Sequence, residues 1–152
     1  MPSRRAEIAM TEEELHAFLA EQMVMHCATV GPSGRPHLVS LWYVPHGIEL
    51  LGWTYAKSQK AKNLERDPRA TVEVEDGVEY QELRGVMLEC DVEVERDPER
   101  VADYGLALVD RYTGGAPEMK DFFRAQARKR VGLRFVPTRV VSWDHRKLGG
   151  GY

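Results

Sequence analysis

The sequence predicts a mainly β protein, a small and mostly antiparallel barrel with helices at its edges. Roughly six or seven short segments are rich in β-branched and aromatic residues, and turn residues separate most of them. Two of these segments alternate between apolar and polar side chains, as half-buried strands do. The 152 residues contain no internal repeat or linker-like stretch, so we expect a single domain over residues 1–152. Closing the sheet into a barrel would protect its edges.

The first predicted element is a helix over residues 11–21. Thr11 and Glu14 have the spacing of a capping box, in which each side chain accepts a hydrogen bond from the backbone N–H of the other residue. Turns containing glycine and proline follow, and they separate segments that alternate in the manner of strands. These segments predict an antiparallel meander. Its three strands are expected at residues 26–30, 37–44 and 48–55.

A short helix is expected next, between Ser58 as its cap and Arg66 near its end. Pro68 disfavours helical geometry in the residue before it, so the helix should stop there. Later in the chain, Asp97 and Pro98 have the order of an N-cap followed by the first helical position. The remaining pattern predicts strands at 70–75, 88–95, 131–137 and 139–143, helices at 98–112 and 117–129, and a polar tail over 144–152.

Composition and charge exclude several classes of function. A formal net charge of -3 argues against a broad nucleic-acid interface, which usually needs a basic face. No apolar run approaches the roughly 20 residues of a membrane span, and the first residues turn acidic where a signal peptide is apolar. We therefore expect a cytoplasmic protein with no membrane or nucleic-acid partner. Cys27 and Cys90 are expected to be buried thiols, and the five histidines lack the spacing of a metal site.

The segment from Thr54 to Lys62 has the composition of a phosphate site. Thr54 ends a predicted strand, Ser58 caps the following helix, and Lys60 lies in its first turn. That turn offers unpaired backbone N–H groups and the positive end of the helix dipole. Lysine is unfavourable near a helix N-terminus, which indicates that an anion offsets the repulsion.

A solvated helix face is the alternative interpretation of this segment. In that case Glu65 and Asp67 would pair locally with Arg66 and Arg69. Spacing alone does not decide between a phosphate site and a solvated face.

The order of several segments resembles the pyridoxamine phosphate oxidase-like family of flavin- and deazaflavin-dependent oxidoreductases. These segments are ATVGPSGRPHLVSLWY, WTYAKSQKAKNLERDPRATVEVEDG and LRGVMLECDVEV, and the resemblance extends from about Ala9 to Leu148. Its most specific part is Thr54-x-x-x-Ser58-x-Lys60, followed by Asn63-Leu64 and Asp67-Pro68-Arg69. The resemblance implies an FMN-binding type of split β-barrel that forms a homodimer, with FMN or coenzyme F-420 bound between the two barrels.

The resemblance also implies roles for individual residues. The strand from His37 to Tyr43 would pass beside the cofactor ring, and Asn63 would support the phosphate loop. Trp143 would wall the cofactor cleft across the dimer interface, or it would anchor a solvated tail. The cofactor phosphate would contact Thr54, Ser58, Lys60 and Lys62.

Two departures from the family pattern narrow the expected activity. Pyridoxamine phosphate oxidases proper carry an Arg-x-x-Leu-Leu-Lys stretch and a C-terminal Arg-Leu-His motif, and this sequence has neither, so oxidation of vitamin B6 is not expected. Coenzyme F-420 carries carboxylates beyond its phosphate. Lys57, Lys62 and Arg66 exceed what one FMN phosphate requires, which favours F-420 over FMN, the alternative.

We therefore expect an oxidoreductase that transfers hydride to a small conjugated substrate. The candidate proton donors are Tyr43, His37 and Tyr80, and for each of them a packing role is the alternative. No pair of acidic and basic residues stands out in the sequence. A protein that binds the cofactor, or a related tetrapyrrole or phosphate compound, without turnover is therefore the second hypothesis.

Overall fold

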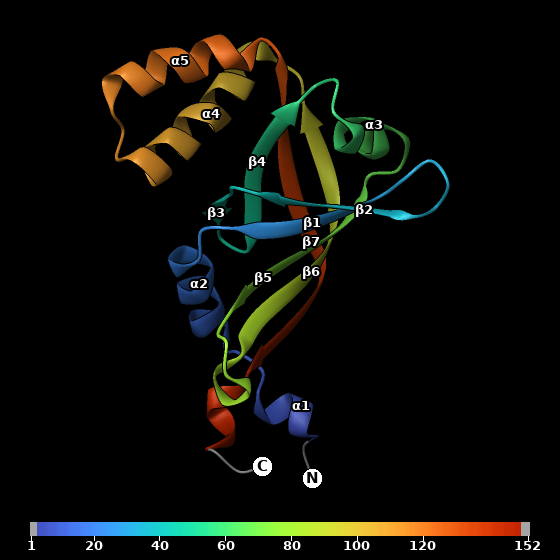
Figure 1. Cartoon of the computed structure of the whole chain (residues 1–152), viewed down its shortest axis with the longest axis vertical. Coiled ribbons are helices and arrows are strands. Elements are labelled where there is room, and N and C mark those ends of the chain that lie inside the picture. The colour runs from blue at the N-terminus through green and yellow to red at the C-terminus, as the bar shows by residue number, and fades with distance from the viewer. Residues whose placement is uncertain (1–2, 150–152) are drawn as a thin grey trace.

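The alternating segments of the chain pair into one antiparallel sheet in the computed structural model, which describes residues 3–149. The sheet has seven strands in the order β2-β1-β5-β6-β7-β4-β3. It curls so that β1 and β2 run across the long strands β4, β6 and β7, as Figure 1 shows. This architecture confirms the predicted split barrel. The strands are β1 (Met25–Val30), β2 (Pro36–Leu41), β3 (Val44–His46), β4 (Glu49–Tyr55), β5 (Arg69–Asp76), β6 (Arg84–Glu95) and β7 (Arg130–Asp144).

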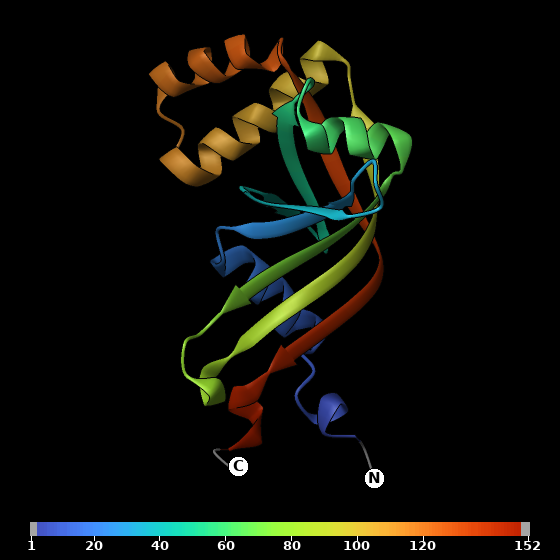
Figure 2. The same ribbon diagram turned by 45° about the vertical axis from the view of Figure 1, so that its right-hand side comes forward.

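Helices lie around the edges of this sheet. In Figure 2 the hairpin of α4 and α5 lies at one end of the sheet, α3 lies beside the same end, and α2 lies below β1. Two short 3₁₀ helices, η1 and η2, contact each other at the opposite end. The helices are α1 (Arg4–Glu7), α2 (Glu12–Glu21), α3 (Gln59–Arg66), α4 (Pro98–Thr113) and α5 (Pro117–Ala127), and the 3₁₀ helices are η1 (Tyr80–Glu82) and η2 (His145–Leu148).

The ends of α2 and α3 follow from local sequence signals. Thr11 Oγ1 accepts from the Glu14 N–H, and the Glu14 carboxylate accepts from the Thr11 N–H, both at 3.1 Å. This geometry confirms the predicted capping box. Ser58 Oγ accepts from the Ala61 N–H at 3.2 Å, and α3 ends at Arg66 as predicted.

The single strand predicted over 37–44 is wrong, because the structure interrupts it at Trp42 and Tyr43. The Tyr43 N–H donates to the Tyr112 hydroxyl at 2.9 Å, and the Tyr43 carbonyl accepts from the Arg111 guanidinium at 2.6 Å. Side chains of α4 therefore provide the hydrogen-bond partners of the Tyr43 N–H and carbonyl groups. Tyr43 does not need to pair with a neighbouring strand.

The Arg111 guanidinium also closes the end of α2. It donates to the carbonyls of Leu19 and Ala20, both at 3.2 Å, and to the carbonyl of Gln22 at 2.6 Å. These are carbonyls that a helix end leaves without partners. The guanidinium lies 4.6 Å from the centroid of the Tyr43 ring. One side chain thus ties together α2, α4 and the link between β2 and β3.

The two strands predicted at the C-terminal end of the sheet are one continuous strand, β7. The register between β6 and β7 shifts between Glu89 and Cys90, where Pro137 lies opposite Cys90 and Arg139 lies opposite Glu89. Thr138 is the extra residue of this bulge. A bulge tolerates proline because the missing N–H interrupts no regular ladder. The apparent break at Pro137 is therefore a bend within one strand.

The core lies on the concave face of the sheet, and helix α2 closes it from below with Phe18 and Leu19. Cys27 and Cys90 are buried free thiols, and burial raises the pKa of each to about 12. At that pKa both thiols stay protonated and inert. The other buried core side chains include Met25, Tyr43, Leu50, Leu64, Val72, Val74, Val86, Leu88, Leu133 and Phe135.

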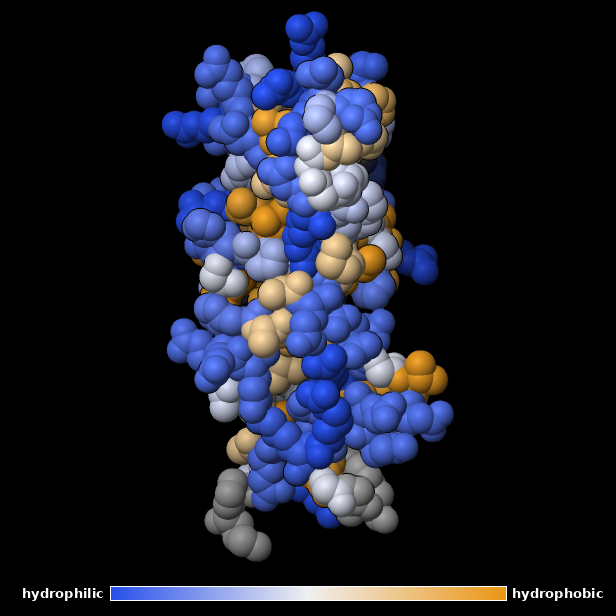
Figure 3. All heavy atoms as spheres, turned by 90° about the vertical axis from the view of Figure 1, so that its left-hand side faces the viewer, coloured by the Kyte–Doolittle hydropathy of each residue, from blue (hydrophilic) through white to orange (hydrophobic). Residues whose placement is uncertain are grey.

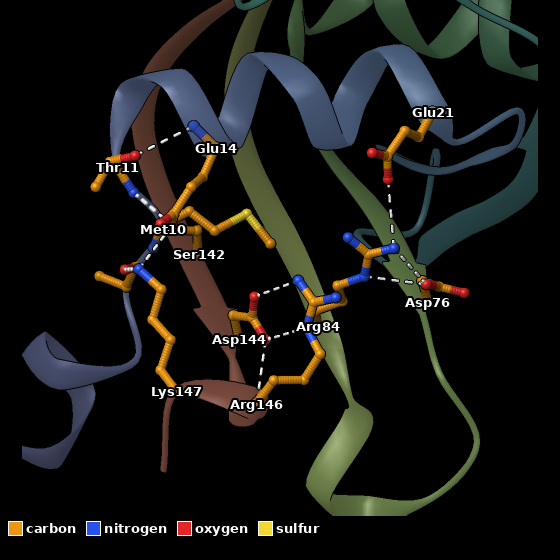
Figure 4. Close-up of polar contacts among 11 residues, drawn as sticks. Met10, Thr11, Glu14, Glu21, Asp76, Arg84, Ser142, Asp144, Arg146 and Lys147 are labelled. Atoms are coloured by element: carbon orange, nitrogen blue, oxygen red, sulfur yellow. Dashed lines mark hydrogen bonds and ion pairs between the residues drawn. The ribbon is translucent and has the colours of Figure 1, made fainter. Parts of the chain in front are cut away.

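The segment after β7 is ordered where the sequence predicts a polar tail. Its Lys147 ammonium pairs with the Glu14 carboxylate of α2 at 2.6 Å and donates to the Ala9 carbonyl at 2.8 Å. Arg146 pairs with the buried Asp144 at 2.7 Å. Figure 4 shows this cluster joining α2 to the end of β7. Residues 150–152 of the predicted tail lie outside the described residues.

The outer surface is mostly polar on the side where α2, α4, α5 and β3 lie. Figure 3 shows hydrophobic groups there as small separate patches in a hydrophilic surface. Within residues 3–149, no helix combines the length and apolar character needed to cross a membrane.

We expect Arg111→Met to lower the free energy of unfolding by about 2–3 kcal/mol, because it removes charge-assisted hydrogen bonds and leaves several carbonyls unpaired. Urea denaturation followed by circular dichroism measures this change. Arg124→Met is the matched control, because Arg124 is exposed and pairs only loosely with Asp121 at 3.8 Å. A similar stability for both variants would contradict the structural role of Arg111.

Candidate functional site

Three side chains meet where β4 ends and α3 begins. The Lys60 ammonium donates to Thr54 Oγ1 at 2.8 Å, and Thr54 Oγ1 donates to Ser58 Oγ at 3.2 Å. Thr54 is the last inward-facing residue of β4, and Ser58 is the N-cap of α3. We call Thr54, Ser58 and Lys60 the cradle. The structure thus brings together the three residues that the sequence motif singles out.

Lys60 lies in an environment that disfavours its charge. Partial burial lowers the pKa of the Lys60 ammonium, and the nearby positive charge of Arg130 lowers it further. The electrostatic interaction with Cys27 raises the pKa of Lys60, but by less than burial lowers it. An anion beside the ammonium would relieve both effects.

Asn63 holds α3 against the sheet. Its side chain is fully buried, donates to Thr29 Oγ1 at 3.0 Å and accepts from Gln59 Nε2 at 2.8 Å. Thr29 belongs to β1, so this contact sets the position of the helix relative to the strand. Asn63 is placed to support the cradle rather than to contact a ligand.

The basic residues around α3 fall into two groups. Lys57 and Lys62 are exposed, and neither forms an ion pair with any residue from 3 to 149. The Arg66 guanidinium instead donates to the Val30 carbonyl and so connects α3 to the end of β1. This hydrogen bond to a neutral carbonyl leaves the charge of Arg66 in place, but it restrains the guanidinium near the end of β1.

The local pairing expected of a solvated helix face forms only in part. Arg69 pairs with Asp67 at 2.7 Å, and this contact lowers the pKa of Asp67 to about 2. Glu65 lies 3.9 Å from Arg96 rather than beside Arg66. These exposed contacts lie at the C-terminal end of α3 and leave its N-terminal end open.

Two buried polar atoms, one on β2 and one on β7, have no hydrogen-bond partner among the described residues. They are Nδ1 of His37 and Nε of Arg130. His37 lies opposite Thr29 in the pairing of β1 and β2, and Thr29 is the residue that contacts Asn63. Arg130 begins β7 opposite Tyr55, one residue after Thr54. Buried polar groups are normally paired, so these two indicate a place for a missing partner.

An aromatic pocket adjoins Arg130 on the other face of β4. Its volume is about 270 Å³. The Trp53 ring stacks on Phe123 at 5.3 Å between centroids, and the Trp42 ring stacks on Tyr112 at 4.2 Å. The residues that line this pocket are Ser40, Leu41, Trp42, Trp53, Leu108, Phe122, Phe123, Gln126 and Arg130.

A glycine lets helix α4 approach this pocket. A Cβ added to Gly105 would lie 2.4 Å from Cζ3 of Trp53, so no other residue fits there without moving the ring or the helix. The sequence motifs did not single out Arg130, Trp42 or the pair Phe122–Phe123. These residues come from separate elements. Only Arg130 has a local signal, because it ends the basic run at the start of β7.

The other candidate residues do not join the cradle within one chain. Tyr43 is fully buried in the core, where its hydroxyl lies 2.7 Å from the Leu19 carbonyl, and burial raises its pKa to about 12. This environment favours the packing role. Tyr80 and Trp143 lie at the opposite end of the sheet, where Tyr80 contacts His145 and Trp143 packs onto Gly85.

Comparisons with known proteins agree with this architecture. The family model described as pyridoxamine 5'-phosphate oxidase matches residues 11–144. The conserved hypothetical protein Rv2991 from Mycobacterium tuberculosis is 43% identical to this chain, with a TM-score of 0.90 over 99% of this chain and 95% of that chain. No curated protein matches the chain.

More distant structures share the fold. An F420 reductase is 27% identical, with a TM-score of 0.64 over 82% of this chain and 94% of that chain. The heme storage protein HutZ from Vibrio cholerae is 20% identical, with a TM-score of 0.69 over 86% of this chain and 94% of that chain, and it shows the fold alone. The family match and the split barrel confirm the resemblance drawn from the sequence, and this chain belongs to the pyridoxamine 5'-phosphate oxidase family.

Proposed function

We propose that this protein binds a phosphorylated flavin-type cofactor, coenzyme F-420 in first place, and uses it as an oxidoreductase. One observation carries the proposal: the side chains of Thr54, Ser58 and Lys60 converge at the open N-terminal end of α3. A phosphate there would accept hydrogen bonds from the ammonium, a hydroxyl and the unpaired N–H groups of the first helical turn. It would also offset the charge that burial disfavours on Lys60.

An unpaired buried atom supports a cofactor larger than a phosphate. Nδ1 of His37 on β2 has no partner among the described residues, and His37 lies opposite Thr29, which Asn63 of α3 contacts. A flavin or deazaflavin ring attached to the phosphate carries carbonyls and N–H groups that can pair with this atom. The residues present therefore fit such a group.

The exposed lysines favour F-420 over FMN. Lys57 and Lys62 carry positive charge that no described residue neutralises, beyond the charge that one phosphate needs. The tail of F-420 brings additional carboxylates, which can pair with these lysines. Arg66 is also positively charged, but its hydrogen bond to the Val30 carbonyl restrains it near the end of β1.

When bound, the cofactor supplies hydride to a conjugated organic substrate. The protein orients the two molecules: the cradle holds the phosphate, and the split between β2 and β4 confines the ring. Of the three proposed proton donors, His37 is the one whose strand partner, Thr29, contacts α3 through Asn63. We assign it the role of contacting the cofactor or substrate.

Cofactor binding without turnover is the second candidate function. It is favoured by the positions of Tyr43, which is buried, and Tyr80, which lies at the other end of the sheet. A protein that binds without turnover needs the cradle but no proton donor. Oxidation of reduced F-420 in the presence of quinones, enones or nitro compounds separates the two functions.

We expect Lys60→Ala to weaken cofactor binding by about 1.5–3 kcal/mol, the range for a hydrogen bond to a charged group. Titration of the purified protein with F-420 and with FMN measures this change. Lys120→Ala is the control, because Lys120 lies on α5 and pairs with Asp110. Unchanged affinity of the Lys60 variant for both cofactors would show that the phosphate does not lie in the cradle.

The salt dependence of binding tests the choice of cofactor. We expect F-420 affinity to fall more steeply with salt than FMN affinity, because each exposed ion pair contributes about 0.2–1 kcal/mol and is screened over about 10 Å at 0.1 M. Replacing both Lys57 and Lys62 by alanine should flatten this difference. Equal salt slopes for the two cofactors in the unmodified protein would remove the argument for the F-420 tail.

We also propose that the protein is a homodimer whose cofactor cleft lies between two barrels. A groove of about 480 Å³ crosses the outer face of β1, β5 and β6. Leu38 on the outer face of β2 is 67% exposed and lies opposite Ala28 of β1. An apolar side chain so placed is suited to burial against a second copy.

Sedimentation at micromolar concentration is expected to give twice the mass of one chain. Leu38→Glu should shift the protein towards the monomer, because it places a carboxylate in the interface. Val78→Glu, at an exposed turn, should not. A monomer in the unmodified protein would contradict the homodimer.

A further inference from the structure

We propose that the aromatic pocket between the α4–α5 hairpin and β4 binds a flat conjugated acid, an aromatic ring system that carries a carboxylate or phenolate. The geometry of the pocket alone supports binding of such a ligand. The role of the pocket as the substrate site of an oxidoreductase rests on the proposed function. The class of ligand follows from the shape, the rings and the charge of the residues that line the pocket.

The walls of the pocket are aromatic. Trp53 and Phe123 stack almost parallel, with 4° between their planes, and form one wall. Trp42 is 48% exposed and Phe122 is 55% exposed, so large aromatic surfaces face the opening without a covering element among residues 3–149. Rings of this kind favour a flat, conjugated ligand that can stack on them.

Arg130 supplies the only charge among the residues that line the pocket. Its guanidinium lies over the Trp53 ring at 4.6 Å and over the Tyr55 ring at 4.0 Å, which holds it in one orientation. Its Nε–H donates to no described atom. A guanidinium held in this way is suited to two parallel hydrogen bonds with a carboxylate. The charge of the pocket therefore selects an anion.

The pocket bridges the split in the sheet. Ser40 and Leu41 end β2, Trp42 follows them, and Trp53 comes from β4, which does not pair with β2. Trp53 and Tyr55 precede and follow Thr54 of the cradle, and they point to the opposite face of β4. The pocket and the cradle therefore lie on opposite faces of the same end of β4. The volume of about 270 Å³ admits two fused rings rather than a large macrocycle.

Calorimetric titration with 2-naphthoate, on the full chain without added cofactor, tests the proposal. The uncharged isostere 2-naphthamide and the saturated acid cyclohexanecarboxylate are the comparison ligands. We expect 2-naphthoate to bind at least about tenfold more tightly than 2-naphthamide, because it adds a charge-assisted contact. It should bind about two- to tenfold more tightly than cyclohexanecarboxylate, because it adds a stacking contact. Equal binding of acid and amide, or no binding of the acid at millimolar concentration, would overturn the proposal.

Three variants locate the binding. Arg130→Gln should reduce naphthoate affinity to that of the amide, about tenfold, and Phe122→Ala should weaken both ligands alike. Arg124→Gln on α5 should change neither, because Arg124 does not line the pocket. If Arg130→Gln fails to fold by circular dichroism, Phe122→Ala decides, because its side chain is exposed. Loss of affinity in Arg124→Gln equal to that in Arg130→Gln would show a general charge effect and refute the assignment.

Cofactor titrations on the same samples separate this proposal from the proposed function. Lys60→Ala should leave naphthoate binding intact while it weakens F-420 or FMN. If the unmodified protein binds naphthoate but neither cofactor, the pocket assignment holds and the proposed function fails. If it binds a cofactor but not naphthoate, the pocket assignment alone fails.

Discussion

The interruption of the sheet at Tyr43 is the constraint on which the site depends. Arg111 and Tyr112 of α4 hold the backbone of Tyr43, so β3 pairs with β4 only from Glu49 to Leu51. The following residues of β4, up to Tyr55, pair with β7 alone. The cradle, Arg130 and the aromatic pocket all lie along this part of β4. A continuous strand over 37–46 would have left no split in which to place them.

An open strand edge carries a risk, because unpaired backbone groups can recruit another strand. Here α3 and the α4–α5 hairpin lie beside the open part of β4 and keep other chains away from it. The same elements supply Ser58, Lys60 and the pair Phe122–Phe123. The elements that protect the edge of β4 therefore also form the site. The hydrogen bonds of Arg111 then stabilise the fold and define the site together.

The sequence predicts well what neighbouring residues decide. The capping box at Thr11 joins residues three positions apart, Thr54, Ser58 and Lys60 lie within six positions, and α3 is eight residues long, so motif spacing is enough to place them. The break at Tyr43 and the continuity of β7 through Pro137 depend on α4 and on the register with β6, which no local pattern contains. Arg130 and the aromatic pocket were missed for the same reason. Their residues meet only when the sheet curls.

Gly105 has a consequence for how such a protein can diversify. Because α4 touches Trp53 at a position where no side chain fits, the distance between this helix and the sheet cannot change gradually by substitution at that residue. The wall formed by Phe122 and Phe123 on α5 has no such restriction, and Phe122 is largely exposed. Substitutions that reshape the pocket can therefore accumulate on α5, while α4 and Arg130 keep their positions. The pocket thus has a half that the packing of α4 fixes and a half on α5 that can vary.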